Sequence, residues 1–162
     1  MKIMKGIPVV LAAAGLAIVL PGPAWAAGAP QPASGTLQIT SETVDSVRVA
    51  DGNTFRVVTL SGIATGTFAG PFTETDHEVI HADGSVNLQG MGVQSGTLGT
   101  CGTGSASYVT EATGTVFGLT GRFQLNNQAA STSTPLKIHS VDTLTVDTAT
   151  GLATYTGTYH CT

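Results

Sequence analysis

The segment His77-Glu78-Val79-Ile80-His81 reads H-E-x-x-H, the sequence that binds zinc in metallopeptidases. That chemistry needs both histidines on one helix face, one turn apart, so that their imidazoles bind Zn²⁺ while the glutamate activates a metal-bound water. Gly84 falls where the longer form of the motif has its glycine, but Asn87 stands where its third histidine would be. The motif predicts a zinc peptidase only if the segment is helical.

The residues around the motif favour a strand. Thr73, Thr75, Val79 and Ile80 are β-branched, and Asp83-Gly84 has the composition of a hairpin turn. Histidines four residues apart in a strand are separated by about 13 Å, which is too far for one ion held by bonds of about 2 Å. We therefore expect no metal site and no cofactor.

Three acids precede or interrupt the motif. In a strand, Glu74, Asp76 and Glu78 share one face with Ile80, opposite the two histidines. Such a row could attract Ca²⁺, which prefers several carboxylate oxygens. It is more often a solvated face, or charge protection on an exposed strand. We expect the solvated face.

The other histidines suggest no chemistry. His139 and His160 lie at opposite ends of predicted strands, with no partner identifiable by spacing, and are expected to be ordinary, partly buried residues. The sequence has no G-x-S-x-G elbow, phosphate loop or C-x-x-C motif. Catalytic and ligand-binding residues are therefore left unassigned.

The amino-terminal segment has the pattern of a targeting sequence. Lys2 and Lys5 precede the apolar stretch 7–20, which is followed by the small-residue site Ala24-Trp25-Ala26. The apolar run is about 14 residues, whereas a membrane-spanning helix needs about 20. We expect residues 1–26 to be a signal peptide cleaved after Ala26, so that the product is secreted to the extracellular space and leaves the membrane.

The charge of the chain excludes some partners. There are 6 basic and 10 acidic residues, which gives a formal net charge of −4, and no cluster of Lys or Arg. Nucleic-acid binding is excluded because phosphates would be repelled. The charged share of 10% also differs from the quarter or so of ordinary cytosolic enzymes.

Cys101 and Cys161 are the 2 cysteines of the chain. In an oxidising compartment two cysteines in one chain usually pair. Neither has a Lys or Arg within several residues to activate a thiolate. We expect a disulfide that staples the domain.

The rest of the chain predicts an all-β domain. Residues 27–34 look like a flexible leader, and residues 35–162 are rich in Thr, Val, Ile and Gly, with no apolar spacing typical of helices. Hairpin turns are expected at 51–53, 83–85 and 148–151, and a polar loop at 126–134. The strands are expected near 36–40, 43–50, 54–60, 63–69, 72–81, 85–98, 105–125 in two pieces, 136–146 and 152–160.

A glycine stands two residues before an aromatic residue in Thr65-Gly66-Thr67-Phe68, Thr120-Gly121-Arg122-Phe123 and Thr156-Gly157-Thr158-Tyr159. Glycine is tolerated in a strand where the sheet bends sharply or where a neighbouring aromatic ring lies across it. Both are common in closed sheets. We expect an antiparallel up-and-down barrel of about eight strands, with a two-sheet β-sandwich as the alternative.

Several segments resemble small bacterial proteins of the allene-oxide-cyclase-like barrel family. They are Ser61–Phe68, Phe72–Thr75, Ala82–Val86 and the closing hairpin Ala149–Tyr159, and the resemblance covers most of residues 61–160. It implies an eight-stranded antiparallel barrel with an apolar interior. Plant cyclases of this fold convert a lipid epoxide into a cyclopentenone with polar groups and a bound water. Those polar groups match no motif here, so the activity is not carried over.

Three function classes remain. The first is a secreted barrel without enzymatic activity that binds a small apolar ligand in its interior, because such an interior is wide enough for side chains or for one small ligand. The second is an isomerase or cyclase-like enzyme that uses the same cavity. The third is an extracellular surface or interaction protein. The sequence leaves the ligand and the oligomeric state open.

Overall fold

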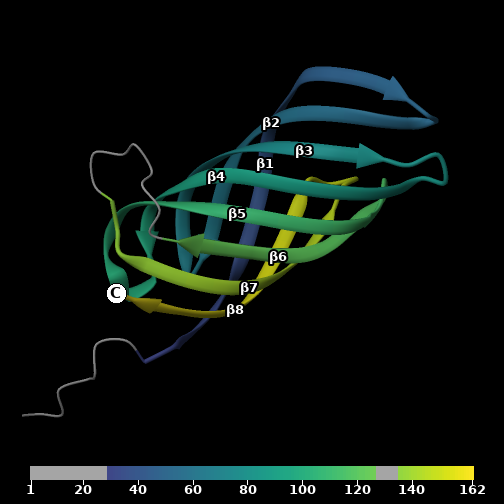
Figure 1. Ribbon diagram of the computed structural model, residues 1–162. Coiled ribbons are helices and arrows are strands. Elements are labelled where there is room, and N and C mark those ends of the chain that lie inside the picture. Colours follow the sequence, from purple (N-terminus) through teal and green to yellow (C-terminus); the bar gives the residue numbers. More distant parts are fainter. Residues whose placement is uncertain (1–28, 127–134) are drawn as a thin grey trace, which may run out of the picture.

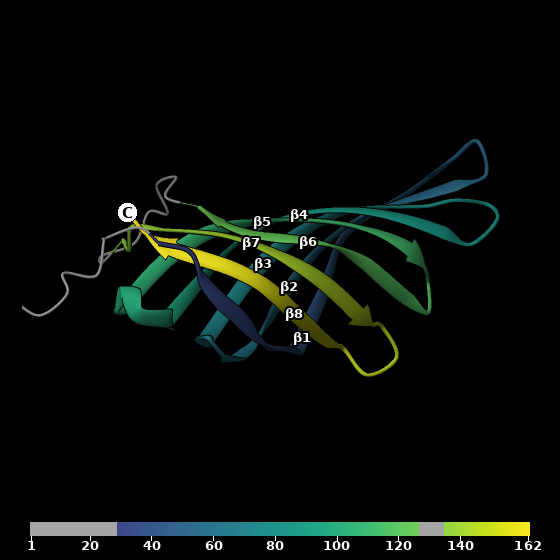
Figure 2. The same ribbon diagram turned by 90° about the horizontal axis from the view of Figure 1, so that it is seen from below.

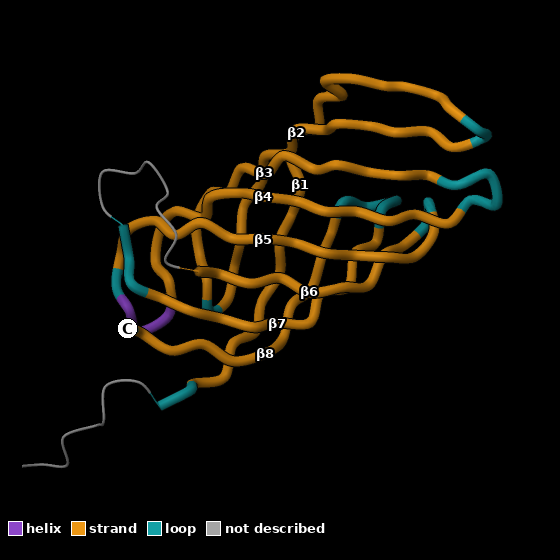
Figure 3. The backbone as a smooth tube through the Cα atoms, in the orientation of Figure 1, coloured by secondary structure: helices purple, strands orange, loops and turns teal. Residues whose placement is uncertain are grey.

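The computed structural model describes residues 29–126 and 135–162. Eight antiparallel strands form a closed barrel in which each strand pairs with the next and β8 pairs with β1 (Figure 1). The strands are β1 (Gln31–Ala50), β2 (Asn53–Gly66), β3 (Phe68–Ile80), β4 (Ser85–Leu98), β5 (Thr103–Thr115), β6 (Gly118–Asn126), β7 (Ile138–Asp147) and β8 (Leu152–Cys161). A single turn of 3-10 helix, η1 (Gly99–Cys101), lies beside the carboxyl terminus (Figure 3). The barrel prediction is confirmed, and the sandwich alternative is wrong.

The first strand is longer than the sequence pattern predicts. Residues 36–40 and 43–50 belong to the single strand β1, whose pairing with β2 shifts register between Ile39 and Ser41 and again between Val44 and Ser46. Each bulge reverses the alternation of inward and outward side chains, which makes one strand read as two. β1 also begins at Gln31, inside the expected leader.

The expected hairpin turns are present among the described residues. The hairpin turns after β1, β3 and β7 lie where their Asp and Gly residues predict them, and Asp51 and Gly52 both have positive φ, of 52° and 77°. The expected signal peptide 1–26 and most of the expected loop 126–134 lie outside the described residues.

The strands are strongly tilted within the barrel. A row of paired residues that starts at Val44 of β1 runs through Asp76 and Asp142 and returns to β1 at Ala33, far from its start. This stagger is what closes a sheet into a barrel. At one end of the barrel the β1–β2 and β3–β4 hairpins reach beyond the other strands (Figure 2). We call this the hairpin end.

The interior at the opposite end is filled by aromatic side chains. The Phe68 ring stacks on Tyr155 at 5.3 Å and meets the edge of Tyr159 at 5.7 Å, and Phe123 packs against Tyr108 at 4.8 Å. The Tyr155 hydroxyl accepts a 2.8 Å hydrogen bond from the Phe68 backbone N–H. The disulfide between Cys101 and Cys161 closes this end, as expected.

The glycines explain how the rings fit, though not at the positions that the sequence suggests. Gly66, Gly121 and Gly157 lie directly against backbone of the neighbouring strand, because the sheet curves tightly there. Aromatic rings lie instead over other glycines, where a Cβ atom would strike Tyr155, Phe72, Tyr108 or Tyr159. Those four are Gly35, Gly62, Gly92 and Gly99.

Candidate functional site

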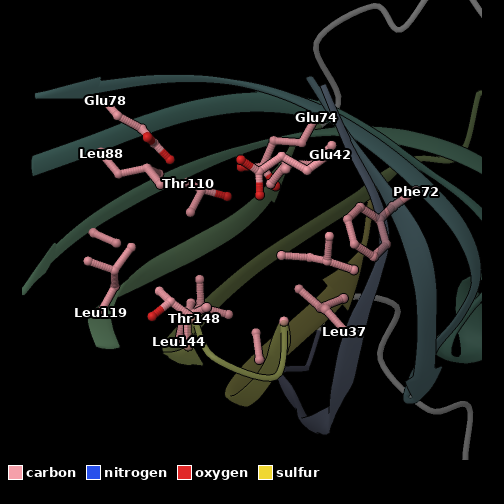
Figure 4. Close-up of a pocket in the computed structure, with 16 residues that line it drawn as sticks. Leu37, Glu42, Phe72, Glu74, Glu78, Leu88, Thr110, Leu119, Leu144 and Thr148 are labelled. Carbon is pink, nitrogen blue, oxygen red and sulfur yellow. The ribbon is translucent and has the colours of Figure 1, made fainter. Parts of the chain in front are cut away.

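A cavity of about 140 Å³ remains between the aromatic core and the hairpin end. Its walls come from all eight strands or their turns and are mostly apolar (Figure 4). The apolar lining residues are Leu37, Ile39, Leu60, Phe72, Leu88, Ala112, Leu119, Leu144, Val146 and Ala153. Thr110, Thr148 and three glutamates are the polar lining residues with side-chain oxygen atoms.

The cavity continues toward the hairpin end into a second hollow of about 250 Å³. The two share Glu42, Glu78, Leu119 and Thr148 as lining residues. Arg56 of β2 lies in the outer hollow and pairs with Glu42 at 2.6 Å and with Glu78 at 3.4 Å. We call this hollow the vestibule, because it is the route by which a molecule could reach the cavity.

The acids of β3 point into the barrel. Glu74 is 8% exposed and Asp76 is 2% exposed, and Glu78 lines the cavity and the vestibule. The expected solvated face is therefore wrong. The sequence did contain evidence for the inward orientation. Phe68 and Phe72 lie an even number of residues from these acids along β3, so they share a face with them, and phenylalanines must face the core.

Glu74 and Asp76 form a buried carboxyl pair. Both reach over Gly90 of β4, where a Cβ atom would overlap Glu74 Oε1 and Asp76 Oδ1 at the same time. These two facing oxygens have no hydrogen-bond partner among the described residues, whereas the Tyr108 hydroxyl donates a hydrogen bond of 3.1 Å to the other Glu74 oxygen, Oε2. Glycine at position 90 thus leaves the space in which the pair meets.

Asp76 keeps its proton at neutral pH. Burial, followed by the closeness of the Glu74 carboxyl group, raises the pKa of Asp76 to about 9. Burial and the charge of Glu74 also raise the pKa of Tyr108 well above its usual value. Asp76 therefore carries a proton next to Glu74, and carboxyl groups with such shifted pKa values are typical of proton-transfer or ligand-binding sites.

A third buried acid lies across the barrel. Asp142 of β7 is 1% exposed, and its Oδ1 atom reaches over Gly157 of β8. Burial raises the pKa of Asp142 to about 6, although the nearby Ser140 hydroxyl acts in the opposite direction. Neither carboxyl oxygen has a hydrogen-bond partner among the described residues. Asp142 is absent from the cavity lining, so it belongs to the core.

The H-E-x-x-H segment lies in a strand, as expected. β3 extends to Ile80, and His77 is exposed on the outer face while Glu78 points inward. His81 follows the strand, and its Nε2 atom is 2.9 Å from Asn87 Nδ2. Across residues 29–126 and 135–162, no group of three or more His, Cys, Asp or Glu side chains is placed to hold a metal ion.

The structure also pairs the two remaining histidines. His139 and His160 are direct neighbours in the β7–β8 register, and their rings lie 5.2 Å apart. Spacing alone could not reveal this contact, because it depends on which strands pair and in which register. Each ring comes from the strand face that points away from the barrel interior.

No helix among the described residues is long and apolar enough to cross a membrane. No protein-family model matches the chain, and no curated protein matches it.

Proposed function

We propose that this protein is secreted and binds a small, mostly apolar molecule inside its barrel, with one polar group of that molecule at Glu74. The observation that carries the proposal is the apolar cavity that is lined by Glu74, one member of the buried carboxyl pair, and that opens on its outer side into the vestibule. Ligand sites commonly combine apolar walls with a few such polar groups. The disulfide is compatible with secretion.

The cavity volume sets the size of the buried part of the ligand. An apolar cavity of about 150 Å³ holds one benzene molecule, and this cavity measures about 140 Å³. A six-membered ring or a chain of about six carbons therefore matches it. A longer molecule would extend into the vestibule past Leu119 and Thr148.

We expect toluene and benzyl alcohol to bind the purified protein in a one-to-one ratio, with dissociation constants of about 0.1–1 mM for ligands of this size. Ala153→Leu should weaken both at least about tenfold, because Ala153 lies between Leu37 and Val146 in the cavity wall. Isothermal titration calorimetry measures both effects.

The matched control for that variant is Thr154→Leu, which adds a side chain of the same type on the exposed face of the same strand. It should leave binding unchanged. Saturable binding that survives Ala153→Leu would place the ligand elsewhere and contradict the proposal.

An isomerase or cyclase-like activity, as in the barrel family that the sequence resembles, is the second candidate. It is favoured by the Tyr108–Glu74–Asp76 cluster, which holds a proton beside an apolar cavity. If this candidate is correct, phenylacetone in D₂O should exchange its α-protons faster with the protein than in buffer, and Glu74→Gln should abolish the difference. Exchange at the buffer rate, measured by NMR, would eliminate it for this ligand class.

A further inference from the structure

The carboxyl pair has a hydrogen-bonding requirement that the protein does not meet by itself. Glu74 Oε1 and Asp76 Oδ1 are buried, and neither accepts a hydrogen bond from a donor group of the described residues. Both lie over Gly90, so they face each other across a short gap. Two buried carboxylate oxygens in this arrangement repel unless something positive lies between them. The site needs a shared proton or a donor from outside.

The groups around the pair determine which donor fits. Tyr108 of β5 already donates to the other Glu74 oxygen, Oε2. Glu42 of β1 and Glu78 of β3 add two further carboxylates to the cavity wall. Arg56 of β2, the cationic side chain that lines the vestibule among the described residues, pairs with both. Acidic residues therefore outnumber basic ones in the described lining of the cavity and vestibule, by three glutamates to one arginine, which disfavours a carboxylate ligand and favours a cation.

The space beside Glu74 also fits such a group. Glu74 is one of the cavity-lining residues, and its side chain extends from β3 into the cavity (Figure 4). Thr110 of β5 lines the cavity as well, and offers a hydroxyl oxygen as acceptor. The remaining walls around the cavity are mostly hydrocarbon, so a ligand must combine one polar head with an apolar body.

We propose that the ligand of the cavity is an apolar molecule with a protonated amine, whose ammonium group binds Glu74 in place of the proton that Glu74 shares with Asp76. This inference rests on the proposed function and names its ligand class. An ammonium group supplies three donors, and Glu74 and Thr110 of the cavity lining offer it acceptor oxygens. The displaced proton leaves to solvent. One positive charge thus replaces another, and the total charge at the carboxyl pair is unchanged.

Benzylamine, benzyl alcohol and benzoate test this selectivity, because they share one ring and differ in the head group. At pH 7 benzylamine should bind about tenfold more tightly than benzyl alcohol, and benzoate should bind more weakly than either. Calorimetry in two buffers of different ionisation enthalpy should show about one proton released for each benzylamine bound, and none for benzyl alcohol.

Glu74→Gln should reduce the preference for benzylamine over benzyl alcohol to less than about threefold. Glu111→Gln, the same change on the exposed outer face of β5, should leave the preference intact. The proton count on the unmodified protein keeps the test decisive even if Glu74→Gln fails to fold.

The outcomes separate the two proposals. Equal affinities for amine and alcohol, or amine binding without proton release, would overturn the inference about the amine and leave the apolar-ligand function standing. Failure of toluene, benzyl alcohol and benzylamine alike to bind would overturn the proposed function itself. Tighter binding of benzoate than of benzylamine would show that the negative cavity does not select the head group.

Discussion

Removal of the disulfide should lower the melting temperature of the barrel domain by about 15 °C. Cys101 in η1 and Cys161 at the end of β8 are separated by 60 residues in sequence. Closing a loop of that length stabilises the folded state by about 4 kcal/mol in the chain-entropy model, and about 4 °C per kcal/mol is expected for a domain of this size. The Cys101→Ser, Cys161→Ser double variant, followed by thermal unfolding in circular dichroism, measures the effect.

A hydrogen bond at the same junction provides the control. The Tyr159 hydroxyl accepts a 3.0 Å hydrogen bond from the Thr100 backbone N–H and so joins the same two segments. Tyr159→Phe should cost only about 1 kcal/mol, because a single hydrogen bond contributes about that much. A double serine variant that melts within about 3 °C of the unmodified protein would show that the barrel does not depend on the disulfide.

The fold could be predicted because its signals are local. The turns at Asp51-Gly52 and Asp83-Gly84 need positive φ, which those residue types accept, and they fix the hairpins around β2 to β4. The continuity of β1 could not be predicted. Its bulges depend on how β1 pairs with β2, and that register is a property of the closed barrel.

Part of the candidate site could also be predicted from the sequence, and part could not. Alternation along β3 correctly places Glu74 and Asp76 on one face, but which face is inside depends on the neighbouring strands. Phe68 and Phe72 carry that information, yet three acids in a row suggest solvent more strongly than two phenylalanines suggest the core. The role of Gly90 could not be predicted, because it lies on another strand and acts by leaving space.

The stability of the protein should fall as the pH rises from about 4 to about 9. The folded state raises the pKa of Asp76 from 3.8 to about 9 and that of Asp142 to about 6. Each group binds its proton more tightly in the folded state than in the unfolded state. Its contribution to the free energy of unfolding is therefore complete below about pH 4 and is lost as the pH rises to the pKa of the folded state. One such proton corresponds to about 1.4 kcal/mol per pH unit, so a loss of several kcal/mol is expected.

Urea unfolding at a series of pH values, with two asparagine variants, separates the contributions. Asp76→Asn should flatten the decline above pH 6 and make the variant more stable than the unmodified protein at pH 8, by about 2–4 kcal/mol, because a neutral amide no longer requires a proton. Asp142→Asn should remove only the part between about pH 4 and pH 6.

The direction of this dependence distinguishes a buried pair from a solvated row of acids. Hydrogen bonds lower the pKa of the exposed Asp83 and Asp147, so these two groups lose their contribution only as the pH falls below about 4. They cannot produce a decline toward alkaline pH. A stability that is flat or rising between pH 6 and pH 9 would mean that Glu74 and Asp76 do not share a proton inside the barrel. The same result would remove the basis for exchanging that proton with an ammonium group.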